Sequence, residues 1–295
     1  VYKRQVALSA ATGDPVRIEH VRGARPKSGL RPQHLAAVAA VATVCDADVD
    51  GATEGSETLV FRPGPLKGGT VDVAIGTAGS VTLLFDALLP LAPVLPTPVT
   101  ASATGGTDVK WAPPLDYARR VKLPLLADYG LDASMAVERR GFYPAGEGQA
   151  TLTVRPSDLR PLDVTERGDL RTVEVHSVAS ETLSDAEVAA RQAQAASEQL
   201  DALGLPNVVG TVSYVETVST GSVVVLDAAY ERTRAGFDAL GERGVASEAI
   251  AKRAVEDLAA FHVGMGAVDE HMGDQLLPFL AFAGGTVLVP RVTDH

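Results

Sequence analysis

The chain has 295 residues and a formal net charge of −11, because 37 Asp and Glu outnumber 26 Lys and Arg. Hydrophobic residues make up 46% and charged residues 21%, which is typical of globular proteins and excludes wholesale disorder. The single cysteine excludes an intrachain disulfide and cysteine-rich zinc modules, and the acidic balance argues against a protein coated in nucleic acid.

The best apolar stretch, residues 81–94, is too short to span a membrane and is interrupted by Asp86, Pro90 and Pro93. One cysteine fits a reducing compartment, so we expect a cytoplasmic protein with no membrane partner. The apolar run near the N-terminus is short and meets a turn sequence at once, which argues against a signal peptide. We expect instead that the start is missing and that the chain enters partway through an element.

Helices and strands alternate in the first half of the chain. Apolar residues at helical spacing predict a helix over residues 32–45, followed by a strand at 57–62. A second helix over 114–129 precedes a hairpin pattern with strands at 132–138 and 149–154. The shared plan of helix, turn and strands predicts repeated α/β units packed around a common axis.

The second half contains extra sequence before the plan returns. A strand at 169–178, a helix at 184–203 that begins with a capping box of Ser184 and Glu187, and strands up to residue 227 predict an inserted α/β domain over 166–228.

A third segment of the same plan has helices at 247–261 and from about 270, then a strand at 286–289. We therefore expect residues 1–165 and 229–295 to form the first and last parts of one main domain. The predicted class is α/β or α+β.

A basic cluster on a loop rich in Gly and Pro leads directly into a predicted helix start. Arg22, Arg25 and Lys27 belong to this cluster, and Gln33 and His34 follow it. Guanidinium groups bind phosphate with two hydrogen bonds, and the amides of a helix start add a positive end. The cluster favours anion binding, and a solvated loop is the alternative.

Three further motifs carry polar groups or glycine beside apolar residues. The turn 76–80 precedes a predicted helix, and the turn 105–108 precedes an apolar wall at 111–114; plain tight turns explain both equally well. His271 and Asp274 share one helix face, next to Gln275. No second His-rich segment supports zinc there, and a solvated helix face is the plainer interpretation.

Taken in order, these segments resemble the RNA 3'-terminal phosphate cyclase family. The matching stretches are residues 22–35, 61–64, 74–80, 105–108, 112–114, 141–144, 240–244 and 269–275. Such a long ordered series is far more specific than any single member.

The resemblance implies a fold of three repeated βα units, related to the enolpyruvyl-transferase architecture, with a small inserted α/β domain. It also implies a ligase-class enzyme that consumes ATP with Mg²⁺ or Mn²⁺. A histidine nitrogen would attack the α-phosphorus of ATP, AMP would pass to an RNA 3'-phosphate end, and the adjacent 2'-hydroxyl would expel AMP to leave a 2',3'-cyclic phosphate. By position after the last motif, His295 is the expected nucleophile.

The resemblance assigns the other site residues by segment. Those expected to bind ATP are His271, Met272, Gly273, Asp274, Gln275, Asp86, Pro113 and Pro114. Those expected to bind the RNA end or phosphate are Arg22, Arg25, Lys27, Gln33 and His34.

Three departures from the family pattern stand out. The family's Gly-rich opening, with its Glu near the metal, is absent, so no metal ligand is assigned. The chain stops at His295, where the family continues, so we expect an archaeal or bacterial member that is truncated at both ends. Asp86 stands where many members have Gln, which is expected to weaken or alter nucleotide binding.

Two other functions remain alternatives at this point. A non-catalytic RNA-processing paralogue would keep the fold and would have no reason to place a histidine at His295. An enolpyruvyl transferase would bind a small dianionic acid and form no adenylate, and the ordered motifs disfavour it. The oligomeric state and the physiological RNA stay open.

Overall fold

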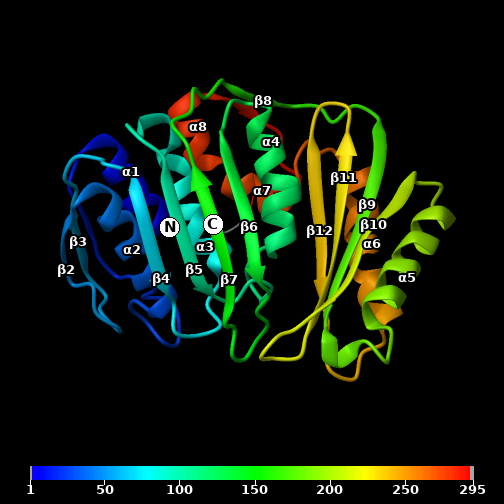
Figure 1. Ribbon diagram of the computed structural model, residues 1–295. Helices are drawn as coiled ribbons and strands as arrows, with labels where there is room; N and C mark the ends of the chain where they lie inside the picture. Colours follow the sequence, from blue (N-terminus) through cyan, green and yellow to red (C-terminus); the bar gives the residue numbers. More distant parts are fainter. Residues whose placement is uncertain (1, 293–295) are drawn as a thin grey trace.

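The computed structural model describes residues 2–292, and Figure 1 shows three groups of strands beside one another with helices packed against them. A four-stranded sheet lies at the centre, a small antiparallel sheet lies at the N-terminal side, and a second four-stranded sheet lies at the other side. None of the helices that the structure describes is both long and apolar enough to cross a bilayer.

The N-terminal layer combines three short strands with two helices. Its elements are α1 (Tyr2–Thr12), β1 (Val16–Ile18), α2 (Pro32–Cys45), β2 (Asp48–Asp50) and β3 (Leu59–Arg62). The strands pair antiparallel in the order β1-β3-β2. The bounds of α2 confirm the predicted helix, which Pro32 starts and Asp46 ends with a left-handed backbone (φ 50°).

The central sheet has the order β4-β5-β7-β6. Its elements are β4 (Gly69–Ala74), α3 (Val81–Leu88), the 3₁₀ helix η1 (Leu89–Val94), β5 (Val99–Gly105), the π-helical segment η2 (Tyr117–Lys122), α4 (Leu123–Ala127), β6 (Ala133–Arg139) and β7 (Gly148–Val154). Strands β4 and β5 are parallel, and β6 and β7 form the predicted antiparallel hairpin. Alternate residues of β5 and β7 are buried, because helices cover one face.

The second four-stranded sheet has the order β10-β9-β11-β12. Its elements are β9 (Leu170–Ser180), the 3₁₀ turn η3 (Glu181–Leu183), α5 (Val188–Ala202), β10 (Asn207–Val215), β11 (Ser222–Tyr230), β12 (Arg234–Leu240) and α6 (Ser247–Val263). One face packs on α5 and α6 around a hydrophobic core of its own. The opposite face meets η2, and Figure 1 shows α4, which continues η2, standing between β6 and β12.

The start of α5 differs from the prediction. The helix begins at Val188, and Glu187 precedes it with a left-handed backbone (φ 51°) and no side-chain cap. The amide of Ser184 donates to the carbonyl of Glu181, and the amide of Glu187 donates to that of Ser184. These turn hydrogen bonds occupy the backbone where the capping box was expected, so the helix starts four residues later.

The extent of the smaller unit follows from which elements share its core. The predicted boundary at residue 228 lies inside β11, and both β12 and α6 contribute buried residues to the same core as α5. We propose that this unit runs from β9 through α6.

The last elements return to the main core. Helices α7 (Glu270–Gln275) and α8 (Leu277–Ala283) precede β13 (Gly285–Val287), which pairs in parallel with β8 (Leu162–Val164). Met272, Leu276 and Phe279 are buried in the same hydrophobic cluster as α2 and α3. The mixed α/β class is therefore confirmed, whereas the plan of three repeats stays a prediction.

Candidate active site

Two adjoining cavities share a wall that contains Leu83, residues 109–112 and Leu240. The first, here called the helix-α7 cavity, has a volume of about 550 Å³, and the second, the glycine-loop cavity, about 1100 Å³. The helix-α7 cavity is lined by five residues of the expected ATP set: Asp86, Pro113, His271, Asp274 and Gln275. The glycine-loop cavity is lined by four of the expected RNA set: Arg22, Arg25, Gln33 and His34.

The remaining expected residues lie elsewhere. Met272 is fully buried in the main core, and Pro114 is also buried. Gly273 packs so closely that an added Cβ would stand 2.6 Å from Cγ1 of Val289. Lys27 is exposed on the basic loop, outside the cavity lining. These four residues therefore lie close in the sequence to residues that line the cavities but do not line them themselves.

The start of α7 is anchored by one buried carboxylate. Asp269 accepts hydrogen bonds from the amides of Met272 and Gly236, both at 2.9 Å, and from the hydroxyl of Tyr117 at 2.8 Å. Burial raises the pKa values of both Asp269 and Tyr117. Asp269 thus joins α7 to β12 and η2, and it holds His271 at the cavity with its ring edge-on to that of Tyr117.

Asp86 has a buried partner that its sequence position does not reveal. Its Oδ1 lies 2.6 Å from Nζ of Lys122, whose side chain is only 2% exposed. Both residues line the helix-α7 cavity. An amide at position 86 would leave the buried ammonium without its counter-charge, so the carboxylate is matched to Lys122.

The two carboxylate oxygens of Asp274 differ, because one forms an ion pair and the other lacks a hydrogen-bond donor. Its Oδ2 lies 2.5 Å from a guanidinium nitrogen of Arg4. Its Oδ1 is buried and has no hydrogen-bond partner among the described residues. A buried acceptor without a donor is costly, so this oxygen suits a ligand that brings an N–H group into the cavity.

Asp238, on β12, adds a titratable group to the same cavity. Burial of its carboxyl raises its pKa to about 7, while His271 acts in the opposite direction. Asp238 therefore exchanges its proton near neutral pH, which is the range in which perturbed groups at functional sites act.

The basic loop is held in place by its own polar groups. The guanidinium of Arg22 donates to the carbonyl of Gly29 at 3.3 Å, and Nδ1 of His34 accepts from the amide of Arg31 at 2.9 Å. That bond fixes the orientation of the His34 ring at the start of α2. The loop thus presents donors at the cavity in a fixed arrangement.

The glycine turn 76–80 packs directly on α2. The amide of Ser80 donates to Oε1 of Gln33 at 3.2 Å, and a Cβ on Gly79 would stand 3.0 Å from Cβ of Gln33. The Ser80 hydroxyl caps α3 by accepting from the amide of Leu83. Gln33 therefore fixes the turn relative to the basic loop, and only a glycine allows this close approach.

Two exposed aromatic residues line the glycine-loop cavity. Trp111 is 96% exposed with a left-handed backbone (φ 65°) and also lines the helix-α7 cavity, and Tyr143 is 73% exposed. In the sequence, residue 111 was interpreted as part of an apolar wall. The lone Trp ahead of two prolines was the only local signal for a role of Trp111 in binding. Nothing in the sequence pattern pointed to Lys122 or Asp238, because tertiary packing creates their surroundings.

The expected nucleophile, His295, lies outside the described residues. Four residues before it, Nη2 of Arg291 donates to both carboxylate oxygens of Glu270, at 2.7 and 2.6 Å, and Glu270 lines the helix-α7 cavity. The last described part of the chain is thus tied to the cavity rim.

A model of the RNA 3'-terminal phosphate cyclase family matches residues 1–295. The chain belongs to this family. The resemblance inferred from the ordered motifs is therefore confirmed, and the enolpyruvyl-transferase alternative is not supported.

Family members from archaea are similar over nearly the whole chain. Proteins named RNA 3'-terminal phosphate cyclase from Halobacterium salinarum and Pyrococcus abyssi are 51% and 42% identical to it, covering 98% and 100% of this chain and 86% of each relative. One of the same name from Methanopyrus kandleri is 43% identical over 97% of this chain and 82% of the relative.

Proposed function

We propose that this protein is an ATP-dependent, ligase-class enzyme that converts an RNA 3'-terminal phosphate into a 2',3'-cyclic phosphodiester. One observation carries the proposal beyond family membership. Most residues expected to bind ATP line one cavity, most of those expected to bind the RNA end line a second, and the two cavities share a wall. A reaction that joins a nucleotide to a phosphate end needs such adjoining sites.

The chemistry divides one difficult displacement into three. A histidine nitrogen attacks the α-phosphorus of ATP and pyrophosphate leaves. An oxygen of the RNA 3'-phosphate then attacks the same phosphorus, which frees the histidine. The 2'-hydroxyl finally attacks the activated 3'-phosphorus, loses its proton and expels AMP. A phosphate monoester has no good leaving group of its own, and adenylation supplies one.

The helix-α7 cavity is the proposed nucleotide site. The unused buried oxygen of Asp274 suits an exocyclic amine such as that of adenine, and His271 and Pro113 add ring surfaces around it. Mg²⁺ or Mn²⁺ is expected to accompany ATP and to offset phosphate charge.

No metal ligand is assigned in this cavity. Three of its four carboxylates, Asp86, Asp274 and Glu270, pair with cationic side chains, and the fourth is Asp238. Among the described residues, the cavity lining brings no three carboxylate or histidine ligand atoms to the spacing of a metal site, and no step is attributed to a metal.

The glycine-loop cavity is the proposed site for the RNA end. Arg22 and Arg25 supply guanidinium groups beside His34 and the glycine turn 76–80. In a chain with a net charge of −11, this concentration of donors is the natural place for a phosphate. An RNA substrate also fits a cytoplasmic location, which stays a prediction.

His295 is the proposed nucleophile. It follows Arg291 by four residues in the sequence, and Arg291 pairs with Glu270 on the rim of the helix-α7 cavity. His271 is the competing histidine, but Asp269 anchors its helix as part of the proposed nucleotide site.

The test is self-adenylation with ATP labelled in its α-phosphate. We expect acid-labile label on the protein, lost in His295→Ala and retained in His271→Ala. Label lost only in the His271 variant would exclude our assignment. A wild-type protein that binds RNA ends but takes up no label and closes no RNA would support the non-catalytic paralogue.

A further inference from the structure

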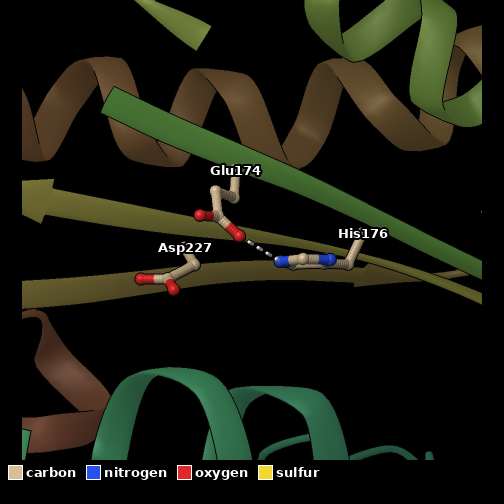
Figure 2. Close-up of side chains that lie close together, drawn as sticks. All are labelled: Glu174, His176 and Asp227. Carbon is tan, nitrogen blue, oxygen red and sulfur yellow. Dashed lines mark ion pairs between the residues drawn. The ribbon is translucent and has the colours of Figure 1, made fainter. Parts of the chain in front are cut away.

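A second cluster of polar side chains lies outside both cavities, on the β9-β10-β11-β12 sheet. Glu174 and His176 are two residues apart on β9, so they share one face of the sheet. Asp227 on β11 lies directly opposite Glu174 in the antiparallel register. Figure 2 shows the three side chains gathered on one side of the two strands.

This face of the sheet is turned toward the helical segment 115–127. Val178, Val223 and Val225 on the same face join the main core, whereas Val173 and Val175 on the other face join the core of α5 and α6. The cluster therefore sits between the two cores, where η2 packs on β11 and β12.

The imidazole of His176 is buried and has one unused nitrogen. Its side chain is 1% exposed, and Nε2 has no hydrogen-bond partner within the described part of the chain. The nearest charged atom is Oε2 of Glu174 at 3.4 Å, the contact drawn in Figure 2. A buried ring nitrogen that faces a carboxylate without a hydrogen bond is an unsatisfied group that calls for a ligand, and a metal ion bound by both groups would satisfy it.

The three groups have the spacing of metal ligands. One ligand atom from each of Glu174, His176 and Asp227 lies within 4.8 Å of the others. Ligands about 2.0–2.2 Å from a tetrahedral Zn²⁺ are roughly 3.3 Å from one another. The His176–Glu174 separation of 3.4 Å is already close to this value, and the other separations are at most 4.8 Å.

The surroundings orient the ligands. Nδ1 of His176 is 3.2 Å from the hydroxyl of Thr211, and Arg234 donates to both oxygens of Asp227 at 3.0 and 2.8 Å. Each carboxylate oxygen retains a second lone pair for a metal. Such outer partners commonly hold metal-binding His and Asp side chains in place.

The backbone of β10 leaves space for the ring. A Cβ on Gly210 would stand 2.6 Å from Cε1 of His176, and the register of β10 shifts at this point. A metal ion can reach the cluster from solvent at Glu174, whose side chain is 47% exposed. Burial also lowers the pKa of His176 to about 4, so its ring is neutral and keeps a lone pair.

We propose that Glu174, His176 and Asp227 form a binding site for one late first-row divalent cation, best suited to Zn²⁺, with water as the fourth ligand. One nitrogen and two carboxylate oxygens are a ligand set that Zn²⁺ accepts with an open position. The ion would join β9 to β11 beneath the 115–127 segment and stabilise that junction. The proposal does not depend on the cyclase reaction.

The experiment uses the untagged full-length protein, stripped with a chelator and titrated with Zn²⁺ in excess Mg²⁺, which occupies sites that prefer hard oxygen ligands. Calorimetry and bound-metal analysis measure stoichiometry and affinity, and Co²⁺ absorption reports the geometry. We expect one equivalent of Zn²⁺, a raised melting temperature, and Co²⁺ bands typical of a four-coordinate site.

The variants separate this site from others. The Glu174 side chain is half-exposed, so we expect the Glu174→Gln variant to fold. It should weaken Zn²⁺ binding about tenfold or more, by analogy with the loss of groups that orient metal ligands. Glu181→Gln, the same change on an exposed residue nearby, should bind like the wild type. His176→Gln should abolish the Co²⁺ bands. A wild type that binds no Zn²⁺, or a Glu174 variant with unchanged affinity, would overturn the proposal.

Discussion

Single side chains decide what each cavity can recognise. In the glycine-loop cavity, the charge is concentrated in Arg22 and Arg25, whereas Lys27 on the same loop is exposed outside the lining. The pair Arg25 and Lys27 therefore offers a matched comparison between a cavity cation and a loop cation of equal charge.

Replacing Arg25 by Ala should slow RNA cyclisation roughly ten- to hundredfold, because a charge-assisted hydrogen bond contributes about 1.5–3 kcal/mol. Self-adenylation should change little, since the proposed ATP site is the other cavity. Lys27→Ala should leave both steps near the wild-type rate. The rates are measured separately, with α-labelled ATP and with a labelled RNA 3'-phosphate, and equal loss in the two variants would contradict the assignment.

The aromatic residues at the same cavity suit unpaired bases. Exposed rings stack on the bases of single-stranded RNA, each worth about 1–3 kcal/mol. Trp111→Ala should therefore raise the KM for RNA about tenfold, with no loss of stability because the ring is 96% exposed. Trp111→Phe should restore much of the affinity. If RNA binding were unchanged while ATP binding weakened, the ring would belong to the nucleotide site instead.

At the scale of elements, the position of α7 depends on its capping carboxylate. This helix has six residues and little stability of its own. Asp269 connects it to β12 and η2 through three hydrogen bonds, so the cavity is assembled by contacts between distant segments.

Asp269→Asn should destabilise the fold by about 1–3 kcal/mol, because one of its buried donors would face an amide N–H rather than an oxygen. The KM for ATP should rise as His271 and Asp274 lose their fixed position. Tyr117→Phe, which removes one hydrogen bond, should show a smaller loss of about 1 kcal/mol in urea unfolding. An Asn variant as stable as the wild type would argue against this anchoring role.

At the scale of the whole molecule, buried acidic groups link stability to pH. The folded state raises the pKa of Asp238 from 3.8 to about 7, so it binds a proton that the unfolded chain has released. Where the folded state binds more protons than the unfolded one, the free energy of unfolding falls as pH rises. This contribution is thus complete below about pH 4 and is lost progressively up to about pH 7.

Asp238→Asn removes the titrating group, so the difference in stability between pH 5 and pH 8 should become smaller than in the wild type. Urea unfolding at the two values measures this. Asp158→Asn, a change at an exposed aspartate, should retain the wild-type difference. A variant with the same difference as the wild type would mean that Asp238 is ionised throughout this range.

Local elements and family membership could both be predicted from the amino-acid sequence. Periodic apolar residues, Pro32 at a helix start and the hairpin pattern of 132–154 are local signals, so α2 and the β6-β7 pair appear where they were predicted. The ordered motifs pointed to several residues that line the cavities, among them Arg25 and Asp274, because motifs are read from short stretches.

Which of these residues meet, and in what surroundings, depends on how distant segments pack together. The pairing of Asp86 with Lys122, the capping network of Asp269 and the cluster around His176 each join residues that are distant in the sequence. The start of α5 was misplaced because turn hydrogen bonds competed with the local cap. Burial, charge pairing and the pKa values that follow from them arise from packing, which no single segment encodes.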